Sequence, residues 1–376
     1  PLREEFSKTN PYPARLITNR KLNADGSQKE TRHFEISLEG SNLNYEAGDA
    51  LSICPKNCPE IVADILRALN FSGEEMISPA NNGEMPLCKA LAEFYDITKP
   101  SPELLKFFGG RNPVLRELLV PERKDDLKKF LWGREVIDLL HETPDAKLSP
   151  KEFVLLLKKL SPRLYSISSS PKSHAGQVHL TVSIVRYETH GRARKGLAST
   201  FLADRVGAET PVPIFFQTAH GFRLPANGDT PVIMVGPGTG VAPFRAFLHE
   251  RRAVGAKGRN WLFFGEQRAA TDFYYRDELE KMFSDSHLTK LSTAFSRDQA
   301  EKIYVQHRML EHAAEFWSWL ESGAHFYVCG DANRMAKDVD DALHKIIETT
   351  GGKSADDAKA YVAKLKTDKR YQRDVY

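Results

Sequence analysis

Two segments in the second half of the chain carry residue types that suit a phosphorylated dinucleotide. The first, residues 236–240, reads Gly-Pro-Gly-Thr-Gly and joins a short apolar run to a segment with helical spacing. Glycines allow backbone N–H groups to approach a pyrophosphate, and the N-terminus of a following helix adds positive potential. A tight strand-to-helix turn without a ligand explains these residues equally well, so the motif gains weight only from the second segment.

The second segment lies further along the chain and offers groups that match a phosphomonoester. Ser296 supplies a hydroxyl, Arg297 a planar guanidinium and Lys302 an ammonium, all within seven residues. These donors suit the extra phosphate that distinguishes NADPH from NADH. Tyr304 could stack on adenine and Gln306 could hydrogen-bond nearby. Together the two segments predict redox chemistry with NADPH.

Two details of these segments bear on the choice of nucleotide. Glu266 follows the run 261–265, where an acid that binds the ribose 2′-hydroxyl of NADH would stand. The larger set of phosphate-binding residues outweighs this single acid. The glycine segment departs from the G-x-G-x-x-G pattern, and it lacks the Lys-Ser/Thr of a P-loop, which disfavours hydrolysis of nucleoside triphosphates.

Two shorter motifs suit a flavin. Arg163, Tyr165 and Ser166 belong to the run Arg-Leu-Tyr-Ser, and residues 196–199 read Gly-Leu-Ala-Ser. An arginine can neutralise a pyrophosphate, a tyrosine can lie against an aromatic ring system, and a serine can hydrogen-bond the reactive edge of a flavin. A strand end and a helix N-cap explain the two tetrapeptides equally well.

The chain closes with Arg-Tyr-Gln-Arg-Asp-Val-Tyr, residues 370–376. An aromatic residue at the end of a charged segment indicates either a frayed tail or a ring placed over a cofactor. The second interpretation makes Tyr376 a candidate cofactor contact.

Hydrophobic spacing divides the chain into stretches of different character. Residues 1–52 and 163–223 alternate apolar and polar positions, which predicts strands, whereas 58–160 carry helical spacing. From residue 229 onward strands and helices alternate, as in a parallel sheet wrapped by helices. Strands are expected at 15–18, 33–37, 178–185, 211–217, 232–235, 261–264, 288–295 and 325–329, and helices at 61–69, 87–95, 103–108, 125–131, 134–140, 150–160, 244–254, 277–283 and 335–348.

This pattern predicts a multi-domain chain. A β domain, residues 1–228, is interrupted by a helical insertion at about 58–160, and an α/β domain follows at 229–376. The Pro- and Gly-containing run 225–231 is the expected boundary between the two.

The composition is that of a globular protein and excludes several classes. Of 376 residues, 41% are hydrophobic and 27% charged. No apolar run reaches the roughly 18 residues of a transmembrane helix, and a net charge of +3 does not indicate nucleic-acid binding. The four cysteines are not spaced as zinc ligands, so no metal is expected, and their small number favours a reducing, cytoplasmic setting. The chain starts with Pro1 rather than Met and shows no signal-peptide pattern, so we expect a fragment or a processed product.

Taken in order, these motifs resemble the ferredoxin–NADP reductase module of the diflavin reductase family, and within it the assimilatory NADPH–sulfite reductase type. The likeness spans nearly the whole chain. The segments that carry it are 48–51, 163–166, 181–183 with Tyr187, 196–199, 236–245, 260–265, 296–297, 302–306, 327–338 and 370–376.

The resemblance implies an antiparallel β-barrel that binds FAD, an α-helical connecting insertion and an NADP-binding α/β domain with a parallel sheet. It implies that FAD contacts Arg163, Leu164, Tyr165, Ser166, Thr181, Val182, Ser183, Tyr187, Gly196, Leu197, Ala198 and Ser199, with Tyr376 covering the isoalloxazine ring. It implies that NADPH contacts Gly236, Gly238, Thr239, Gly240, Ser296, Arg297, Lys302, Ile303, Tyr304, Val305, Gln306 and Asp338.

The resemblance also implies hydride transfer from NADPH to FAD. Ser166 would hydrogen-bond near the flavin, Cys329 would lie beside the nicotinamide, and Asp374 would favour the positive charge that develops there. Tyr376 would move aside to admit the nicotinamide. A buried thiol at a strand end explains Cys329 without any catalytic role.

Electrons would pass on to a flavodoxin-like FMN domain and then to a sulfite reductase haemoprotein (beta) subunit, in the sulfur assimilation that serves cysteine biosynthesis. The chain carries no FMN phosphate loop, so FMN would have to be held elsewhere. Two alternatives stay open. One is a free-standing NADPH–flavodoxin or ferredoxin reductase, against which the helical insertion weighs, and the other is a non-catalytic flavin-binding scaffold.

Overall fold

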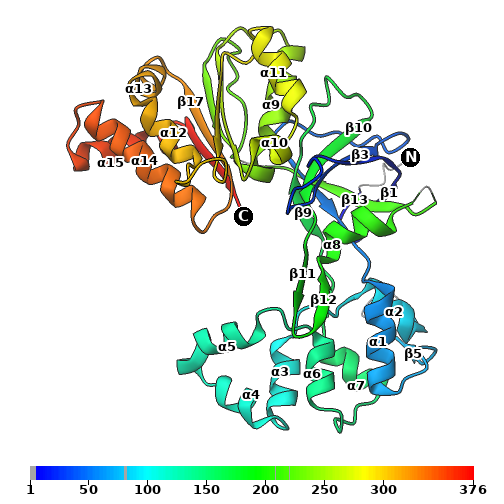
Figure 1. The fold of residues 1–376 in the computed structure, drawn as a ribbon. Coiled ribbons are helices and arrows are strands. Elements are labelled where there is room, and N and C mark those ends of the chain that lie inside the picture. The colour runs from blue at the N-terminus through cyan, green and yellow to red at the C-terminus, as the bar shows by residue number, and fades with distance from the viewer. Residues whose placement is uncertain (1–5, 80–82, 208, 220) are drawn as a thin grey trace. The chain divides into compact units, whose positions relative to one another are not determined.

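The computed structural model describes residues 6–79, 83–207, 209–219 and 221–376, and its contacts divide the chain into two units (Figure 1). None of the helices in the described part of the chain is long and apolar enough to cross a membrane. The first unit combines Pro1–Ser52, Leu164–Ile184 and Ala208–Tyr376, and the second combines Ile53–Arg163 and Val185–Gly207.

Antiparallel sheets form the N-terminal part of the first unit, as the alternating spacing predicts. One has the order β10-β3-β2 and the other β1-β13-β4-β9. In β3 the side chains of Phe34 and Ile36 are fully buried, and His33 and Glu35 occupy the opposite face. The closure of these sheets into a barrel stays a prediction. The strands are β1 (Tyr12–Ala14), β2 (Leu16–Lys21), β3 (Thr31–Ser37), β4 (Ala50–Ile53), β9 (Arg163–Ser166), β10 (Gln177–Ser183) and β13 (Val212–Gln217).

A five-stranded parallel sheet organises the rest of the first unit and confirms the predicted α/β pattern. Its order is β16-β15-β14-β17-β18, and every neighbouring pair is parallel. All residues of β14 and β15 are buried, as expected for strands covered on both faces. The strands are β14 (Val232–Val235), β15 (Asn260–Glu266), β16 (Lys290–Phe295), β17 (His325–Gly330) and β18 (Tyr371–Val375).

Helices cover both faces of this sheet, and alternate strand residues pack into separate cores. Ile233 and Phe263 belong to one core with α12–α15, and Met234 and Phe264 belong to the other with α9 and α11. Figure 1 shows these two sets of helices on opposite sides of the strands. The helices are α9 (Ala242–Ala253), α10 (Ala269–Asp272), α11 (Arg276–Ser284), α12 (Val305–Glu311), α13 (Ala313–Glu321), α14 (Met335–Thr349) and α15 (Ala355–Thr367), preceded by the 3-10 turn η3 (Gly238–Val241).

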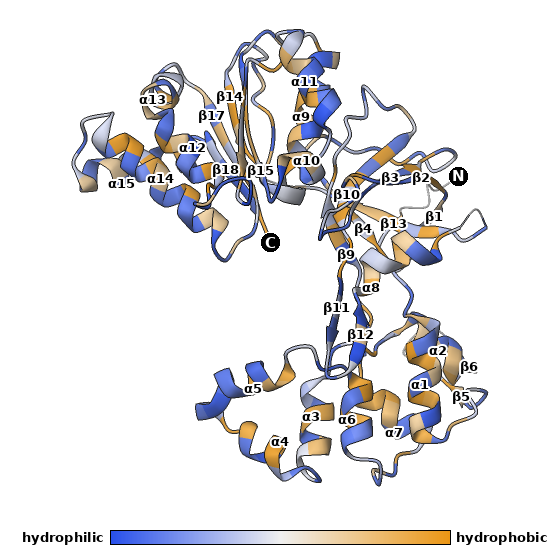
Figure 2. Cartoon of the chain, in the orientation of Figure 1, coloured by the Kyte–Doolittle hydropathy of each residue, from blue (hydrophilic) through white to orange (hydrophobic). Residues whose placement is uncertain are grey.

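The second unit is mainly helical and has its own apolar core, which includes Phe108 and Phe153. Figure 2 shows hydrophobic segments on α6 and α7 and a hydrophilic pair of strands, β11 and β12. The elements are α1 (Pro59–Leu69), β5 (Met76–Ile77), β6 (Met85–Pro86), α2 (Leu87–Glu93), β7 (Tyr95–Asp96), α3 (Pro102–Gly109), α4 (Pro113–Leu118), η1 (Pro121–Arg123), α5 (Lys124–Leu131), α6 (Val136–Glu142), α7 (Pro150–Leu155), β8 (Lys158–Lys159), β11 (Arg186–Thr189), β12 (Arg192–Lys195), α8 (Leu197–Thr200) and the π-helical turn η2 (Phe201–Arg205).

Some predicted elements are wrong in extent. The helices expected at 87–95 and 150–160 both end early, because β7 pairs with β8 in an antiparallel ladder. Short apolar runs suit a helix and a strand alike, and only the tertiary pairing decides between them. The frayed tail considered for 370–376 is also wrong, since β18 is an ordered edge strand beside β17. The domain limits 1–228 and 229–376 stay predictions.

A partly buried ion pair connects α9 to α11 and leads to a pH prediction. Arg245 binds both carboxylate oxygens of Glu278 at 2.8 and 2.9 Å, and His249 lies 2.9 Å from the same carboxylate. Burial pushes the pKa of Glu278 up, but the hydrogen bond from His249 and the charge of Arg245 overcome this and lower it from 4.5 to about 2. The stabilisation is therefore fully present above pH 4.5 and is lost as the pH falls toward 2.

We expect Glu278→Gln to lower the thermal unfolding midpoint at pH 7, with a difference from the parent chain that shrinks below pH 4.5. Glu280→Gln is the matched control, because Glu280 pairs with Arg276 on the exposed side of the same helix. Exposed pairs contribute little to stability. A midpoint difference that stays constant from pH 7 down to pH 3 would contradict the assignment.

Candidate active site

A cavity of about 570 Å³, here cavity A, opens at the carboxyl ends of the parallel strands. Ligands of α/β sheets bind at this edge. Cavity A brings together eight of the residues predicted to bind NADPH. They are Gly238, Ser296, Arg297, Lys302, Tyr304, Val305, Gln306 and Asp338. Ile303 does not line cavity A, because its side chain packs against the core of the sheet.

The glycine segment forms a turn that can exist only with small residues. Gly238 has a φ of +59°, in the left-handed region. A Cβ on Gly240 would lie 2.2 Å from the carbonyl oxygen of Cys329, so this glycine allows the turn to approach the end of β17. The chain then continues into α9 with Pro243 in the first turn. The turn thus places backbone beside cavity A, as the sequence predicts.

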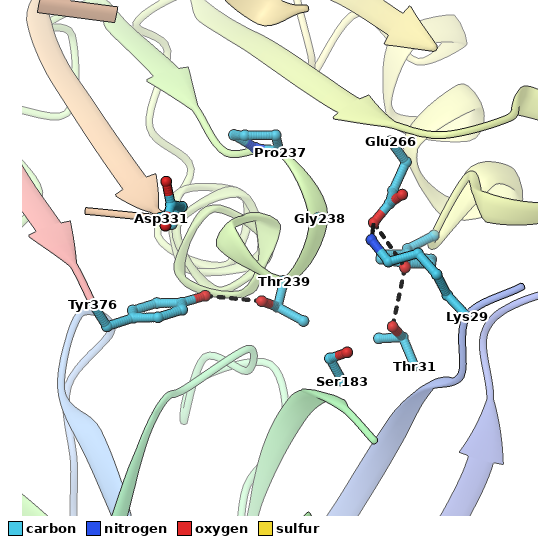
Figure 3. A pocket seen from close by; sticks show the side chains of 11 residues that line it. Lys29, Thr31, Ser183, Pro237, Gly238, Thr239, Glu266, Asp331 and Tyr376 are labelled. Carbon is cyan, nitrogen blue, oxygen red and sulfur yellow. Dashed lines mark hydrogen bonds and ion pairs between the residues drawn. The ribbon is translucent and has the colours of Figure 1, made fainter. Parts of the chain in front are cut away.

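Glu266, the acid that an NADH site would use, already has cationic and hydroxyl partners. Lys29, from the segment before β3, forms an ion pair with its carboxylate. The Tyr274 hydroxyl donates to the same carboxylate at 3.1 Å. Figure 3 shows Lys29 pointing at Glu266 across the cavity edge. Thus the single acid that competed with the phosphate-binding residues is neutralised within the structure.

Two of the residues that line cavity A form side-chain hydrogen bonds with neighbouring groups. The Arg297 guanidinium donates to the side-chain carbonyl of Gln28 at 2.8 Å, and its backbone N–H donates to Gln267. Gln306 donates to Asp338 at 3.2 Å. Sequence reasoning missed Lys29 and Arg334, which also line cavity A. Lys29 comes from a distant segment, so no local spacing could have identified it.

A second cavity of about 530 Å³, cavity B, lies among residues predicted to bind the flavin. Its lining includes two aromatic residues, Tyr165 and Tyr376, and three hydroxyl-bearing residues, Ser166, Thr181 and Thr239. Flat aromatic walls with a few polar groups suit a tricyclic ring with hydrogen-bonding edges, and the volume lies within the usual range for ligand sites. Leu164, Val182, Ser183 and Asp374 complete the set of predicted residues around cavity B.

A serine, an aspartate and a cysteine form one cluster at cavity B. Ser166 donates to the Asp374 carboxylate at 2.6 Å, and the Cys329 thiol lies 3.7 Å from the same oxygen. Asp374 faces Cys329 because β18 pairs with β17 in parallel register. Burial, followed by the charge of Asp374, raises the pKa of Cys329 well above its usual range. The thiol is therefore protonated at neutral pH.

Tyr376 lies between the glycine turn and cavity B. Its hydroxyl is 2.8 Å from the Thr239 hydroxyl, as Figure 3 shows. Its backbone N–H donates to the carbonyl of Gly330 at 3.1 Å. The hydroxyl end is enclosed, which raises the pKa of the phenol, while the residue as a whole is 61% exposed. The backbone of Tyr376 is therefore held at Gly330, whereas more than half of the surface of the residue is exposed to solvent.

A third, smaller cavity of about 280 Å³, cavity C, shares lining residues with both others. Cavity C shares five lining residues with cavity A, namely Lys29, Pro237, Gly238, Glu266 and Asp331. With cavity B it shares Ser183, Thr239 and Tyr376. The three cavities therefore run in sequence from the phosphate-binding residues, past the glycine turn, to the serine cluster.

The other predicted flavin contacts lie in the second unit. Arg163 donates to the Ser161 carbonyl at 2.7 Å and lies 3.7 Å from Asp96. The turn that opens α8 begins at Gly196, and the Ser199 hydroxyl accepts from the backbone of Val185 at 3.2 Å. Leu197 and Ala198 are buried, so they can offer only backbone groups to a ligand. Tyr187 is 43% exposed on β11.

Two family models match different parts of this chain. The family model described as "FAD binding domain" matches residues 4–201, and that described as "Oxidoreductase NAD-binding domain" matches residues 234–341. The first match covers more than half of the chain, and the chain belongs to this FAD-binding family.

Curated relatives agree with this assignment. Three of these relatives bear the name sulfite reductase (NADPH) flavoprotein alpha-component. The relative from Bacillus subtilis (strain 168) is 47% identical over 375 residues, which cover 99% of this chain and 62% of that protein. The relatives from Mannheimia succiniciproducens and Photobacterium profundum are both 46% identical over 373 residues, with 99% of this chain and 62% and 61% of those proteins covered. The chain thus spans about three fifths of the length of the relatives it matches.

Proposed function

We propose that this chain is the FAD- and NADPH-binding module of an NADPH-dependent oxidoreductase of the sulfite reductase flavoprotein type. The observation that carries the proposal is a row of three adjacent cavities that share lining residues. Cavity A holds the phosphate-binding residues, cavity C lies at the glycine turn, and cavity B holds the serine cluster. An extended dinucleotide in this row would have its 2′-phosphate at Arg297 and its nicotinamide near Tyr376.

In this proposal the predicted residues keep the roles that the resemblance implies. When bound, FAD would accept a hydride and then release the two electrons one at a time. Tyr165 and Tyr376 bind against its ring, and Thr181, Val182 and Ser183 contribute the strand beside it. Arg163, Leu164, Tyr187, Gly196, Leu197, Ala198 and Ser199 are the further FAD contacts, and Gly236, Gly240, Ile303 and Val305 join the NADPH contacts.

The serine cluster would act on the hydride-transfer step. Asp374 is placed to favour positive charge on a nicotinamide in cavity B. Ser166 holds the Asp374 carboxylate with a hydrogen bond of 2.6 Å and keeps it oriented. The protonated Cys329 thiol contacts the same oxygen without adding a second charge.

We expect Ser166→Ala to slow flavin reduction by NADPH about 2- to 12-fold, because one hydrogen bond contributes about 0.5–1.5 kcal/mol. Rapid-mixing absorbance of the flavin band measures this rate, and the Kd for NADP⁺ should stay unchanged. Ser173→Ala is the matched control, since Ser173 is exposed and lines neither cavity B nor cavity C. An unaltered reduction rate in Ser166→Ala would remove the serine from the mechanism.

Beyond the flavin, we propose that electrons pass to a flavodoxin-like FMN domain and then to a sulfite-reducing haemoprotein partner. The name shared by the relatives, an alpha-component, supports a second component. We also propose a cytoplasmic location, which the four free cysteines support. A free-standing reductase with another acceptor is the second candidate.

The proposal is tested by the anaerobic visible spectrum of the FAD-reconstituted protein. NADPH should bleach the flavin band quickly and NADH slowly, because cavity A presents cationic groups to a 2′-phosphate. A protein that binds FAD but is not bleached by NADPH would instead be a flavin-holding scaffold. Equal rates with both nucleotides would reject the NADPH preference.

A further inference from the structure

Four histidine rings form a row beside the paired strands β3 and β10. The ring centroids of His33 and His179 are 5.1 Å apart, and those of His179 and His174 are 4.4 Å apart. The ring of His249 follows, 4.9 Å from that of His174. Glu35 joins the row at its first ring, with one carboxylate oxygen 3.1 Å from Nε2 of His33. None of these five residues lines cavity A, B or C.

The register of the two strands brings three possible metal ligands together. β10 pairs with β3 so that His179 lies opposite Glu35 and Thr181 lies opposite His33. These side chains therefore share one face of the sheet. One ligand atom from each of His33, Glu35 and His179 lies within 4.8 Å of the other two. Cysteine spacing predicts no metal, whereas these ligands are distant in the sequence and meet only through this pairing.

The donor set suits a divalent cation such as Zn²⁺, which imidazole and carboxylate groups bind well. Burial lowers the pKa values of His33, His174 and His179, so these imidazoles are neutral at pH 7 and each keeps a lone pair. Nitrogen and oxygen ligands of a tetrahedral Zn²⁺ lie about 3.4 Å apart. The 3.1 Å between Nε2 of His33 and Glu35 is close to this value, and side-chain shifts of about 1 Å would bring in His179.

The two strand histidines also have the outer hydrogen-bond partners that metal-binding histidines need. Nδ1 of His33 lies 2.9 Å from the Tyr275 hydroxyl, and Nε2 of His179 lies 3.0 Å from the side-chain oxygen of Gln177. Such contacts fix the orientation and the tautomer of a ligating ring. In His33 the contact with Tyr275 leaves Nε2, the nitrogen beside Glu35, for an ion.

His174 adds a nitrogen without a partner beside these ligands. Its Nδ1 is buried and has no hydrogen-bond partner among the described residues, although buried polar atoms are nearly always hydrogen-bonded. An ion, or a water bound to it, would satisfy this nitrogen. The charge of Arg245, 3.4 Å from His179, does not exclude a cation, because both carboxylate oxygens of Glu278 bind that guanidinium.

We propose that the side chains of His33, Glu35 and His179 bind a divalent cation of the Zn²⁺ type. His174 would supply the fourth ligand. The site goes beyond the proposed function, since it serves neither the flavin nor the nucleotide. An ion here would connect β3 with β10 and with the loop that carries His174, and so it would stabilise the folded chain.

Titration of the full chain, without a histidine tag, with Zn²⁺ tests the site. We expect the parent chain to compete with a chromophoric chelator for a single Zn²⁺. The ion should also raise the thermal unfolding midpoint, because the ligands meet only in the folded register. Glu35→Gln should lose both effects. Tyr275→Phe should weaken Zn²⁺ binding about 10- to 100-fold, because it removes the hydrogen bond that orients His33.

Glu39→Gln and His141→Ala are the matched controls, since both residues are exposed and lie outside the cluster. They should bind Zn²⁺ like the parent chain. The Glu35 side chain is 28% exposed, so Glu35→Gln should keep the fold, and His179→Gln provides a second test.

Two results would overturn the site. One is a Zn²⁺ affinity that stays unchanged in both Glu35→Gln and His179→Gln, and the other is an unfolding midpoint of the parent chain that Zn²⁺ does not raise. Both readouts are independent of flavin reduction by NADPH, whose failure would reject the proposed function alone.

Discussion

Replacement of Arg297 by alanine should raise the KM for NADPH about 12- to 150-fold and leave the KM for NADH nearly unchanged. A charge-assisted hydrogen bond contributes about 1.5–3 kcal/mol, and only NADPH carries the phosphate that receives it. The structure supports this expectation because Arg297 lines cavity A together with Ser296 and Lys302. Its guanidinium donates to Gln28 at 2.8 Å, which orients it before any ligand is present.

Binding of 2′,5′-ADP and 5′-ADP separates this effect from catalysis. Calorimetry should find that Arg297→Ala weakens only the nucleotide with the 2′-phosphate. Arg276→Ala is the matched control, since Arg276 is an exposed arginine on α11 that pairs with Glu280 and does not line cavity A. Equal losses of affinity for both nucleotides would mean that Arg297 stabilises the loop and does not bind the phosphate.

The structure brings to one cavity several of the residues that local motifs assigned to the nucleotide, and their binding roles stay predictions. The glycine turn and the Ser296/Arg297 segment each lie at the carboxyl end of a parallel strand, β14 and β16, so they meet at one edge of the sheet. The spacing of apolar residues was enough to predict those strands. The side-chain chemistry of a phosphate site was enough to predict the ligand class.

Features that depend on distant contacts were not predictable in this way. Lys29 neutralises Glu266 from a segment that packs there only after folding. β18 contains charged residues, and it forms a strand because it pairs with β17 and not because its sequence favours a strand.

The resemblance, and not residue spacing, assigned Ser166, Cys329 and Asp374 to the same predicted hydride-transfer step. These residues are far apart in the sequence, and no periodicity connects them. The structure brings all three within contact through the register of β17 with β18 and the position of β9. Their catalytic roles stay a prediction that the Ser166→Ala measurement addresses.

Removal of Tyr376 should tighten binding of NADP⁺ about 12- to 150-fold and raise the rate of flavin reduction by NADH. In the proposed function the Tyr376 ring covers the flavin, so a nicotinamide must displace it. Freeing an aromatic side chain from such a contact costs about 1.5–3 kcal/mol, which the nucleotide has to offset. NADH gains more in rate than NADPH, because it lacks the 2′-phosphate contacts that help NADPH to displace the ring.

Tyr376→Phe distinguishes the ring from its hydroxyl. It keeps the aromatic cover and removes only the hydrogen bond of 2.8 Å to Thr239, so its binding of NADP⁺ should stay close to that of the parent chain. Titration with NADP⁺, followed by the flavin absorbance, measures all three proteins under one set of conditions. Because the backbone of Tyr376 is anchored at Gly330 while the residue as a whole is 61% exposed, the structure allows the ring to swing without unfolding β18. Unchanged binding of NADP⁺ and unchanged rates with both nucleotides after deletion of Tyr376 would show that the ring is no gate.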